Sequence, residues 1–198
     1  MNTDMDRNIL YINACVREDS RTERLAKKLL SGFNVPFDEI RLKGISFPAV
    51  DEAYLKERDR LIQEQAFEDP RLGLARQFAQ AEIIVIAAPY WDLSFPASLK
   101  QYIELVNVVG ISFKYSDDGV PVGLCSAKRL YYVTTAGGEY APDEFGYGYI
   151  RALAENYYGI KETVLIKAVG LDIAGADINA ALSEAERNIS ELDTGYPE

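Results

Sequence analysis

The sequence contains no histidine among its 198 residues. This absence excludes a Ser-His-Asp triad, a Cys-His pair and an HExxH zinc site. It also removes the side chain that most often transfers protons at neutral pH. If the chain is an enzyme, we therefore expect a cofactor, rather than its own side chains, to carry the reaction.

Other features are scarce as well. The only two cysteines, Cys15 and Cys125, form no CxxC motif and no disulfide framework. No apolar run approaches the roughly 18 residues that span a bilayer, and the first residues, MNTDMDRN, lack the regions of a signal peptide. The net charge of −10 argues against nucleic acid or an acidic membrane surface as a partner. We expect a cytoplasmic protein with no nucleic-acid or membrane partner.

The length and the hydrophobic content of 48% are typical of one globular domain. No interdomain linker, internal repeat or low-complexity tract interrupts the chain. We expect a single domain over residues 1–198, with short polar tails at about 1–7 and 192–198.

Apolar runs alternate with helical patterns along the whole chain. Strands are predicted at 8–14, 35–42, 82–88, 128–135 and 162–168, and helices at 20–33, 51–66, 70–80, 96–109, 144–158 and 176–191. Residues 113–124 predict a hairpin that turns on Asp118-Gly119. This pattern indicates an α/β three-layer sandwich, in which helices cover both faces of a five-stranded parallel sheet.

The strand order 2-1-3-4-5 is favoured, because the short crossovers must be right-handed and the amphipathic second strand suits an edge. A Rossmann sheet is the alternative, but no GxGxxG motif follows the first strand. In the favoured order, ligands bind beyond the carboxyl ends of strands one and three. The loops after Ala14, Ala88 and Thr135 are therefore expected to form the site.

The first loop, CVREDSRT, leads into a helix, whose N-terminus suits a phosphate. Ser20 and Thr22 add hydroxyl donors, and Arg17 or Arg21 adds positive charge. Against this, the two intervening acidic residues, Glu18 and Asp19, repel an anion.

This first loop also has an interpretation without a ligand. Ser20 and Glu23 form the pattern of a capping box, which occurs at helix starts in general. On this loop alone the cap is slightly favoured. Cys15 is a candidate contact, although a lone cysteine is by default a small buried residue.

The second loop carries two large aromatic residues, Tyr90 and Trp91, where most loops turn on small polar ones. They could stack on a planar ligand, cover the end of the sheet or form a dimer contact. The third loop contains Gly137-Gly138, which lets a backbone approach a ligand closely or simply makes a turn. Together the three loops offer sites for the phosphate, ring and polar edge of flavin mononucleotide (FMN).

Three segments also resemble a known family: APYWDLSFPASLKQYIELV, GISFKYSDDGVPVGL and YYVTTAGGEY. They are similar to the A-P-M-Y-N-F, I-P-x-x-L-K-x-Y-x-D, G-x-x-F-x-Y and T-S-x-G-G motifs of flavodoxin-like FMN-dependent NADH-azoreductases and NAD(P)H:quinone reductases. The resemblance implies a homodimeric enzyme that reduces bound FMN with NADH or NADPH and passes the electrons to a small-molecule acceptor, a quinone or an azo compound. It implies no catalytic side chain and no metal.

The same resemblance implies roles for individual residues. It places Ser20 and Thr22 at the phosphate. The candidates that would flank the isoalloxazine ring are Pro89, Tyr90, Trp91, Asp92 and Leu93. Those that would line its polar edge are Thr135, Ala136, Gly137 and Gly138, and further candidate contacts are Cys15, Arg17 and Tyr140.

The sequence departs from the family pattern at Asp92, where an asparagine is usual. A carboxylate only accepts hydrogen bonds, so it would repel a flavin carbonyl unless it is protonated or turned away. This departure, with the acidic first loop, favours the alternative of a flavodoxin-like electron carrier without reductase turnover. The acidic stretch 51–69 is interpreted as a solvated helix face.

A homodimer is also indicated by aromatic content. The helix at 96–109 and the tyrosine-rich segment 140–158 carry more aromatic surface than one small core requires. The alternative is that these tyrosines pack within the monomer.

Overall fold

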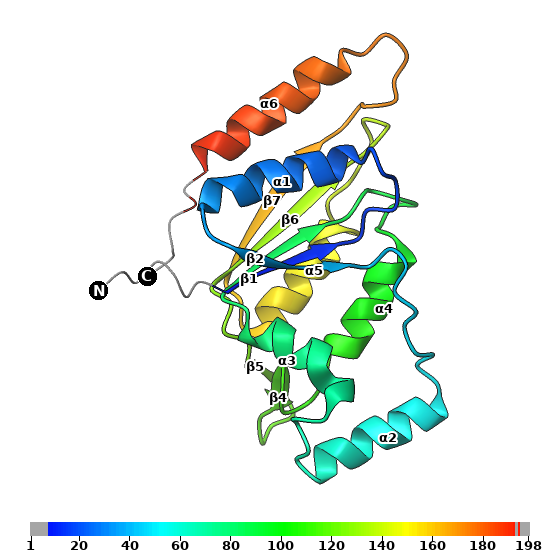
Figure 1. Cartoon of the computed structure of the whole chain (residues 1–198), viewed down its shortest axis with the longest axis vertical. Coiled ribbons are helices and arrows are strands. Elements are labelled where there is room, and N and C mark those ends of the chain that lie inside the picture. Colours follow the sequence, from blue (N-terminus) through cyan, green and yellow to red (C-terminus); the bar gives the residue numbers. More distant parts are fainter. Residues whose placement is uncertain (1–7, 193, 195–198) are drawn as a thin grey trace, which may run out of the picture.

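The computed structural model describes residues 8–192 and residue 194. Its main sheet has five parallel strands in the order β2-β1-β3-β6-β7 (Figure 1). Their bounds are Phe37–Arg41 for β2, Ile9–Asn13 for β1, Ile83–Ala87 for β3, Arg129–Thr135 for β6 and Glu162–Ala168 for β7. This is the predicted order 2-1-3-4-5, so the Rossmann alternative is wrong. The second strand does lie at an edge, with only Ile40 buried.

Helices cover both faces of this sheet. Helices α1 (Arg21–Phe33) and α6 (Ile178–Glu191) lie on one face, and α3 (Gly73–Gln80), α4 (Ala97–Val106) and α5 (Tyr147–Leu153) lie on the other (Figure 1). The strands alternate between the two resulting cores. Ile9 and Tyr11 pack under α1 and α6, whereas Leu10 and Ile12 pack under α3, α4 and α5.

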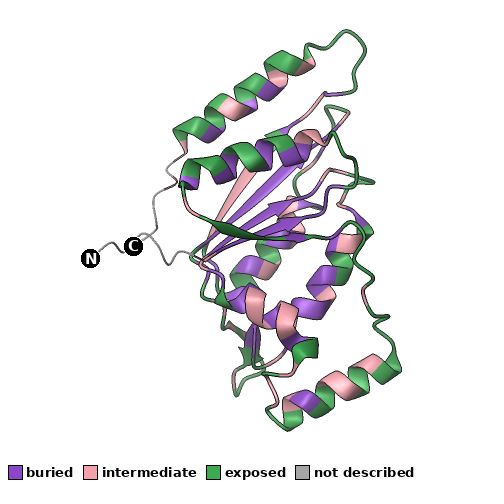
Figure 2. Cartoon of the chain, in the orientation of Figure 1, coloured by how far each residue is buried: buried purple, intermediate pink, exposed green. Residues whose placement is uncertain are grey.

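The central strands are buried along their whole length, which explains their continuous apolar sequences (Figure 2). In contrast, most of α2 (Glu52–Gln63) is exposed and only Leu61 is fully buried there. The continuous apolar sequences thus belong to strands that are buried on both faces, and the charged sequence of α2 belongs to a helix that is mostly exposed to solvent.

Some predicted boundaries shift. The helix expected at 96–109 ends at Val106, and the one expected at 144–158 begins at Tyr147 and finishes as a π-helical turn, η2 (Ala154–Tyr158). Gly159, with φ of 77°, ends that turn in the left-handed conformation that glycine accommodates best. The predicted hairpin forms between β4 (Phe113–Tyr115) and β5 (Pro121–Gly123) and turns at Gly119.

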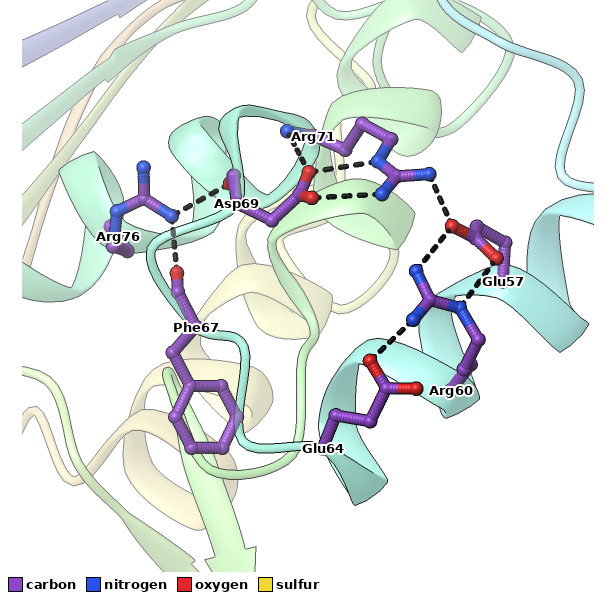
Figure 3. Close-up of polar contacts among 7 residues, drawn as sticks. All are labelled: Glu57, Arg60, Glu64, Phe67, Asp69, Arg71 and Arg76. Atoms are coloured by element: carbon purple, nitrogen blue, oxygen red, sulfur yellow. Dashed lines mark hydrogen bonds and ion pairs between the residues drawn. The ribbon is translucent and has the colours of Figure 1, made fainter.

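Several carboxylates of the acidic segment 51–69 form ion pairs with arginines. Arg60 of α2 pairs with Glu57 and with Glu64, the residue that follows the helix (Figure 3). Arg71, in the short helix η1 (Pro70–Leu72), joins Glu57 to Asp69. Exposed ion pairs of this kind stabilise a fold only slightly. Over α2 the segment is a mostly solvated helix face, as expected, whereas residues 64–69 form turns.

No described helix is long and apolar enough to cross a membrane. Nor do the described residues contain a group of His, Cys, Asp or Glu side chains that could hold a metal ion.

Candidate functional site

A cavity of about 500 Å³ opens at the carboxyl ends of β1, β3 and β6. Its walls come from four loops, at residues 16–22, 89–91, 135–137 and 171–172. Small-molecule sites commonly have volumes of about 300–1,000 Å³. The three loops predicted from the sequence thus meet at one pocket, at the point where the strand order reverses.

The start of helix α1 leaves two backbone donors beside this pocket. Ser20 caps the helix, since its Oγ accepts from the backbone N–H of Glu23 at 3.2 Å. Among the described residues, the backbone N–H groups of Arg21 and Thr22 have no hydrogen-bond partner. Both residues line the pocket. The cap and an anion site are therefore compatible, because the cap uses a different N–H group from those that remain.

The carboxylate of Glu23 does not complete the capping box. It accepts two hydrogen bonds from Arg41, at 2.6 and 3.2 Å, and pairs with Lys27 at 2.8 Å. The hydrogen bonds from Arg41 are the main cause that lowers the pKa of Glu23 to about 2. Arg41 also pairs with Glu39, which accepts from the side-chain amide of Asn13 at 2.9 Å. This network holds the carboxylate of the first helical turn against β2.

Cys15 precedes the first lining residue, Val16, and does not itself line the pocket. Its thiol is completely buried, 3.9 Å from the carbonyl oxygen of Ala87. Its backbone N–H donates to the side chain of Asn13 at 3.0 Å. Burial raises the pKa of the Cys15 thiol to about 11, so the thiol stays neutral at pH 7. The structure matches the default interpretation of this cysteine as a small buried residue.

The aromatic loop ends in a tight two-residue turn. Trp91 and Ser94 exchange backbone hydrogen bonds of 3.1 and 2.7 Å across it. The two residues between them, Asp92 and Leu93, have φ of 50° and 65°. Positive φ at both central residues is the mark of a type I′ turn, which normally contains Asn-Gly. A residue with a branched side chain such as leucine is strained in this conformation.

The ring-bearing side chains of this loop line the pocket. Pro89, Tyr90 and Trp91 line it, and Trp91 is 39% exposed. Tyr90 is fixed by its backbone N–H, which donates to Thr135 at 3.0 Å, and by its hydroxyl, which donates to Pro142 at 3.3 Å. The loop therefore offers apolar rings on a backbone that is held in place.

The loop that contains Gly137 and Gly138 is hydrogen-bonded to a fourth loop, at residues 170–172. Backbone N–H groups of Gly170, Leu171 and Asp172 donate to Gly138, Ala136 and Gly137 in turn, at 3.0, 3.2 and 2.9 Å. A Cβ atom on Gly137 would lie 2.3 Å from the carboxylate Oδ2 of Asp172. A side chain at 137 would therefore displace the Asp172 carboxylate from its present position.

Comparison with known proteins gives the same family. Residues 7–192 match a family described as having a flavodoxin-like fold. The chain belongs to the flavodoxin-like family. An FMN-dependent NADH:quinone oxidoreductase of Clostridium beijerinckii is 37% identical over 186 residues, which cover 89% of this chain and 93% of that protein. The resemblance drawn from the three sequence segments is confirmed.

Two solved flavodoxin-like structures share the fold. The azoreductase from Bacillus anthracis str. Sterne is 23% identical with a TM-score of 0.78, and the match covers 94% of this chain and all of the other (100%). An FMN-dependent NADH-azoreductase from Bacillus anthracis str. Ames Ancestor, solved in complex with FMN, is 24% identical with a TM-score of 0.74. That match covers 93% of this chain and 98% of the other.

The flavodoxin-like pocket brings most of the predicted site residues together. Those that line it are Arg17, Ser20, Thr22, Pro89, Tyr90, Trp91, Thr135, Ala136 and Gly137. The other predicted residues do not line it: Cys15 is buried, Asp92 and Leu93 form the tip of the turn, Gly138 follows the lining residue Gly137, and Tyr140 is 80% exposed.

Sequence reasoning missed Val16 and the fourth loop, with Leu171 and Asp172. The family rule points to loops at the switch point, and the loop after β7 lies two strands away from β3. A glycine followed two positions later by a carboxylate, at the carboxyl end of a strand, was the available signal.

Proposed function

We propose that this chain is an FMN-dependent NAD(P)H oxidoreductase that passes electrons to a quinone or azo acceptor. The observation that carries the proposal is one pocket lined both by a helix start with two unpartnered N–H groups and by the aromatic side chains of Tyr90 and Trp91. The extended similarity to an FMN-dependent NADH:quinone oxidoreductase supports it.

The residues present fit the parts of FMN. The N–H groups of Arg21 and Thr22 suit the phosphate, and the Ser20 hydroxyl, whose oxygen accepts from Glu23, keeps its own hydrogen to donate. Pro89, Tyr90 and Trp91 would hold the isoalloxazine ring. The backbone at 135–137 would line its polar edge.

FMN, when bound, supplies the redox chemistry by accepting electrons from NAD(P)H and releasing them to the acceptor. The chain would bind and orient the reactants, and it has no histidine, the side chain that ordinarily titrates near pH 7. Burial raises the pKa of Tyr90, so its hydroxyl stays protonated at the pocket wall. With no histidine in the chain, we assign no catalytic side chain.

The test begins with purified apoprotein titrated with FMN, followed by visible absorbance. We expect saturable binding of the yellow flavin and loss of its colour when NADH or NADPH is added without oxygen. A protein that ignores FMN would overturn the proposal.

The competing function is a flavin-binding electron carrier. Asp92 favours it, because this carboxylate lies next to the lining residues Tyr90 and Trp91. Steady-state oxidation of NAD(P)H in the presence of a quinone separates the two functions. Tight FMN binding without nucleotide oxidation would establish the carrier instead.

We also propose a homodimer with its contact beside the pocket. Within the tyrosine-rich segment 140–158, Tyr147, Tyr149, Tyr157 and Tyr158 pack in or against the core of the monomer, whereas Tyr140 and Phe145 are exposed. Large exposed apolar side chains follow the strands at the pocket edge: Val16, Trp91, Leu93, Tyr140 and Phe145. Exposed apolar patches of this kind mark interfaces. Light scattering that returned a monomer mass at micromolar concentration would refute the dimer.

We propose a cytoplasmic location on the state of the cysteines. Cys15 and Cys125 are both free thiols, and burial raises the pKa of both. Recovery of the protein in the membrane or extracellular fraction after cell fractionation would contradict this.

A further inference from the structure

The ion pair between Arg21 and Asp172 spans the pocket from helix α1 to the loop after β7. Nη1 of Arg21 donates to the Asp172 carboxylate at 2.7 Å and to the carbonyl oxygen of Leu171 at 2.9 Å. All three residues line the pocket. A carboxylate therefore lies in the pocket that we assign to FMN, paired with a cation at the helix start.

We propose that the Asp172 carboxylate holds the place of the cofactor's phosphate, and that Arg21 exchanges Asp172 for this phosphate when FMN binds. Arg21 would then select FMN over riboflavin, which has the same ring system and no phosphate. This inference rests on the proposed function.

The geometry of Arg21 suits an exchange of partners. Both of its hydrogen bonds in the structure use the same nitrogen, Nη1. A guanidinium has five N–H donors in a planar fork, which matches two oxygens of a phosphate better than a contact through one nitrogen. Arg21 is also the first residue of α1, so its backbone N–H is one of the two unpartnered donors beside the same cavity.

The exchange costs little because the pair is exposed. The side chains of Arg21 and Asp172 are 36% and 63% exposed. Solvent-exposed ion pairs contribute little stability. When Asp172 loses Arg21, it can be solvated by water, while its loop stays in place through the backbone hydrogen bonds to 136–138.

The surrounding charges explain why an arginine is needed. Besides Arg21, the pocket lining includes one other cation, Arg17, and three carboxylates, Glu18, Asp19 and Asp172. A phosphate that enters this lining meets more negative than positive side chains. Arg21 at the helix start is the cation that can offset them when Asp172 releases it.

The experiment measures dissociation constants of FMN and of riboflavin for the apoprotein, by quenching of flavin fluorescence. The variants are Arg21→Gln, Asp172→Asn and the double variant. Helix α1 offers a matched control one turn later. Arg24 pairs with Glu186 of α6 at 2.7 and 3.1 Å, and neither residue lines the pocket. Arg24→Gln and Glu186→Gln are therefore expected to leave the affinity of both flavins unchanged.

The exchange predicts effects on FMN alone. Arg21→Gln is expected to weaken FMN binding roughly 10- to 100-fold, the range for losing a charge-assisted hydrogen bond. Asp172→Asn is expected to tighten FMN binding about two- to fivefold, since the phosphate no longer displaces a carboxylate. Riboflavin binding should change in neither variant.

The double variant separates exchange from simple repulsion. If Asp172 only repelled the phosphate, Asp172→Asn would tighten FMN binding more in the Arg21→Gln background, where no cation offsets the carboxylate. The exchange predicts that the gain disappears there. Unchanged or weaker FMN binding by Asp172→Asn alone, or a gain that persists without Arg21, would overturn the inference. Wild-type protein that binds neither flavin would instead overturn the proposed function.

Discussion

The hydroxyl oxygens of Thr22 and Thr135 lie 2.6 Å apart, in a buried contact between the start of α1 and the end of β6. Two elements that are distant in sequence thus meet through one hydrogen bond at the pocket. Thr22→Val or Thr135→Val leaves the other buried hydroxyl without this partner, and each is expected to cost about 1–2 kcal/mol of unfolding free energy. The double valine variant should cost less than the sum. Urea unfolding of the three variants measures this, and strictly additive costs would show that the hydroxyls are not coupled.

The turn at Asp92 and Leu93 stores backbone strain next to the pocket. Leu93→Gly is expected to raise the unfolding free energy by about 0.5–1 kcal/mol, because glycine adopts positive φ without a steric penalty. Leu93→Ala is the matched control: it also removes the exposed side chain but keeps the penalty, so it should not stabilise. Equal effects of the two variants on the melting temperature would show that the turn is not strained.

Trp91 is expected to act on the ligand more than on the fold. Truncation of a buried core tryptophan costs about 3–5 kcal/mol, whereas Trp91 is 39% exposed at the pocket wall. Trp91→Ala should therefore cost about 1 kcal/mol or less and weaken FMN binding by up to roughly tenfold, the range of aromatic stacking. The melting temperature and the FMN dissociation constant of Trp91→Ala, each compared with wild type, test this prediction. A variant that unfolds but binds FMN normally when folded would make this loop structural.

The Asp92 carboxylate is expected to affect FMN binding through its charge, independently of the Trp91 ring. Asp92→Asn restores the amide of the resembling family at a position that asparagine tolerates well, since its φ is positive. We expect tighter FMN binding if the carboxylate faces the flavin, with no loss of stability. An unchanged FMN dissociation constant would show that the carboxylate points away.

The strand order and three of the pocket loops could be predicted because they follow from local patterns. Each buried strand is a continuous apolar run, and the carboxyl ends of parallel strands must share one edge. The fourth loop could not be predicted in this way. Asp172 reaches the pocket only because β7 pairs with β6, which brings residues 170–172 beside 136–138.

The capping box shows a second limit of prediction from the sequence. Its pattern predicts that Glu23 reaches back to the helix start, but Arg41 comes from β2 and forms two charge-assisted hydrogen bonds with it. A partner distant in sequence outcompetes the local backbone. The tyrosines show a third, since composition counts aromatic residues but not which of them the core takes in, as it does Tyr158.

The buried position of Glu23 makes stability depend on pH. Its folded-state pKa is lowered from 4.5 to about 2, so the stability from its ionised form is present above about pH 5 and is lost as the pH falls toward 2. Glu23→Gln is expected to cost roughly 2–3 kcal/mol at pH 7, and this difference should shrink toward pH 2. Glu57→Gln is the control, because the same low pKa arises there in ion pairs that water screens. Chemical denaturation across this pH range measures both, and a pH-independent cost would contradict the role of the Glu23 charge.

The two adjacent glycines of the third loop are expected to differ in their tolerance of a side chain. A Cβ on Gly137 would lie 2.3 Å from Oδ2, 2.9 Å from Cγ and 3.0 Å from Cβ of Asp172, whereas one on Gly138 meets no atom closer than 4.0 Å. Gly137→Ala must therefore displace the Asp172 side chain, which also breaks its ion pair with Arg21. We expect a loss of about 1 kcal/mol for Gly137→Ala, since the displaced side chain is exposed, and a smaller change for Gly138→Ala. In an Asp172→Ala background the carboxylate is gone, so Gly137→Ala should cost markedly less. Equal costs in the two backgrounds, measured by denaturant unfolding, would show that the cost of Gly137→Ala has another cause than the displacement of Asp172.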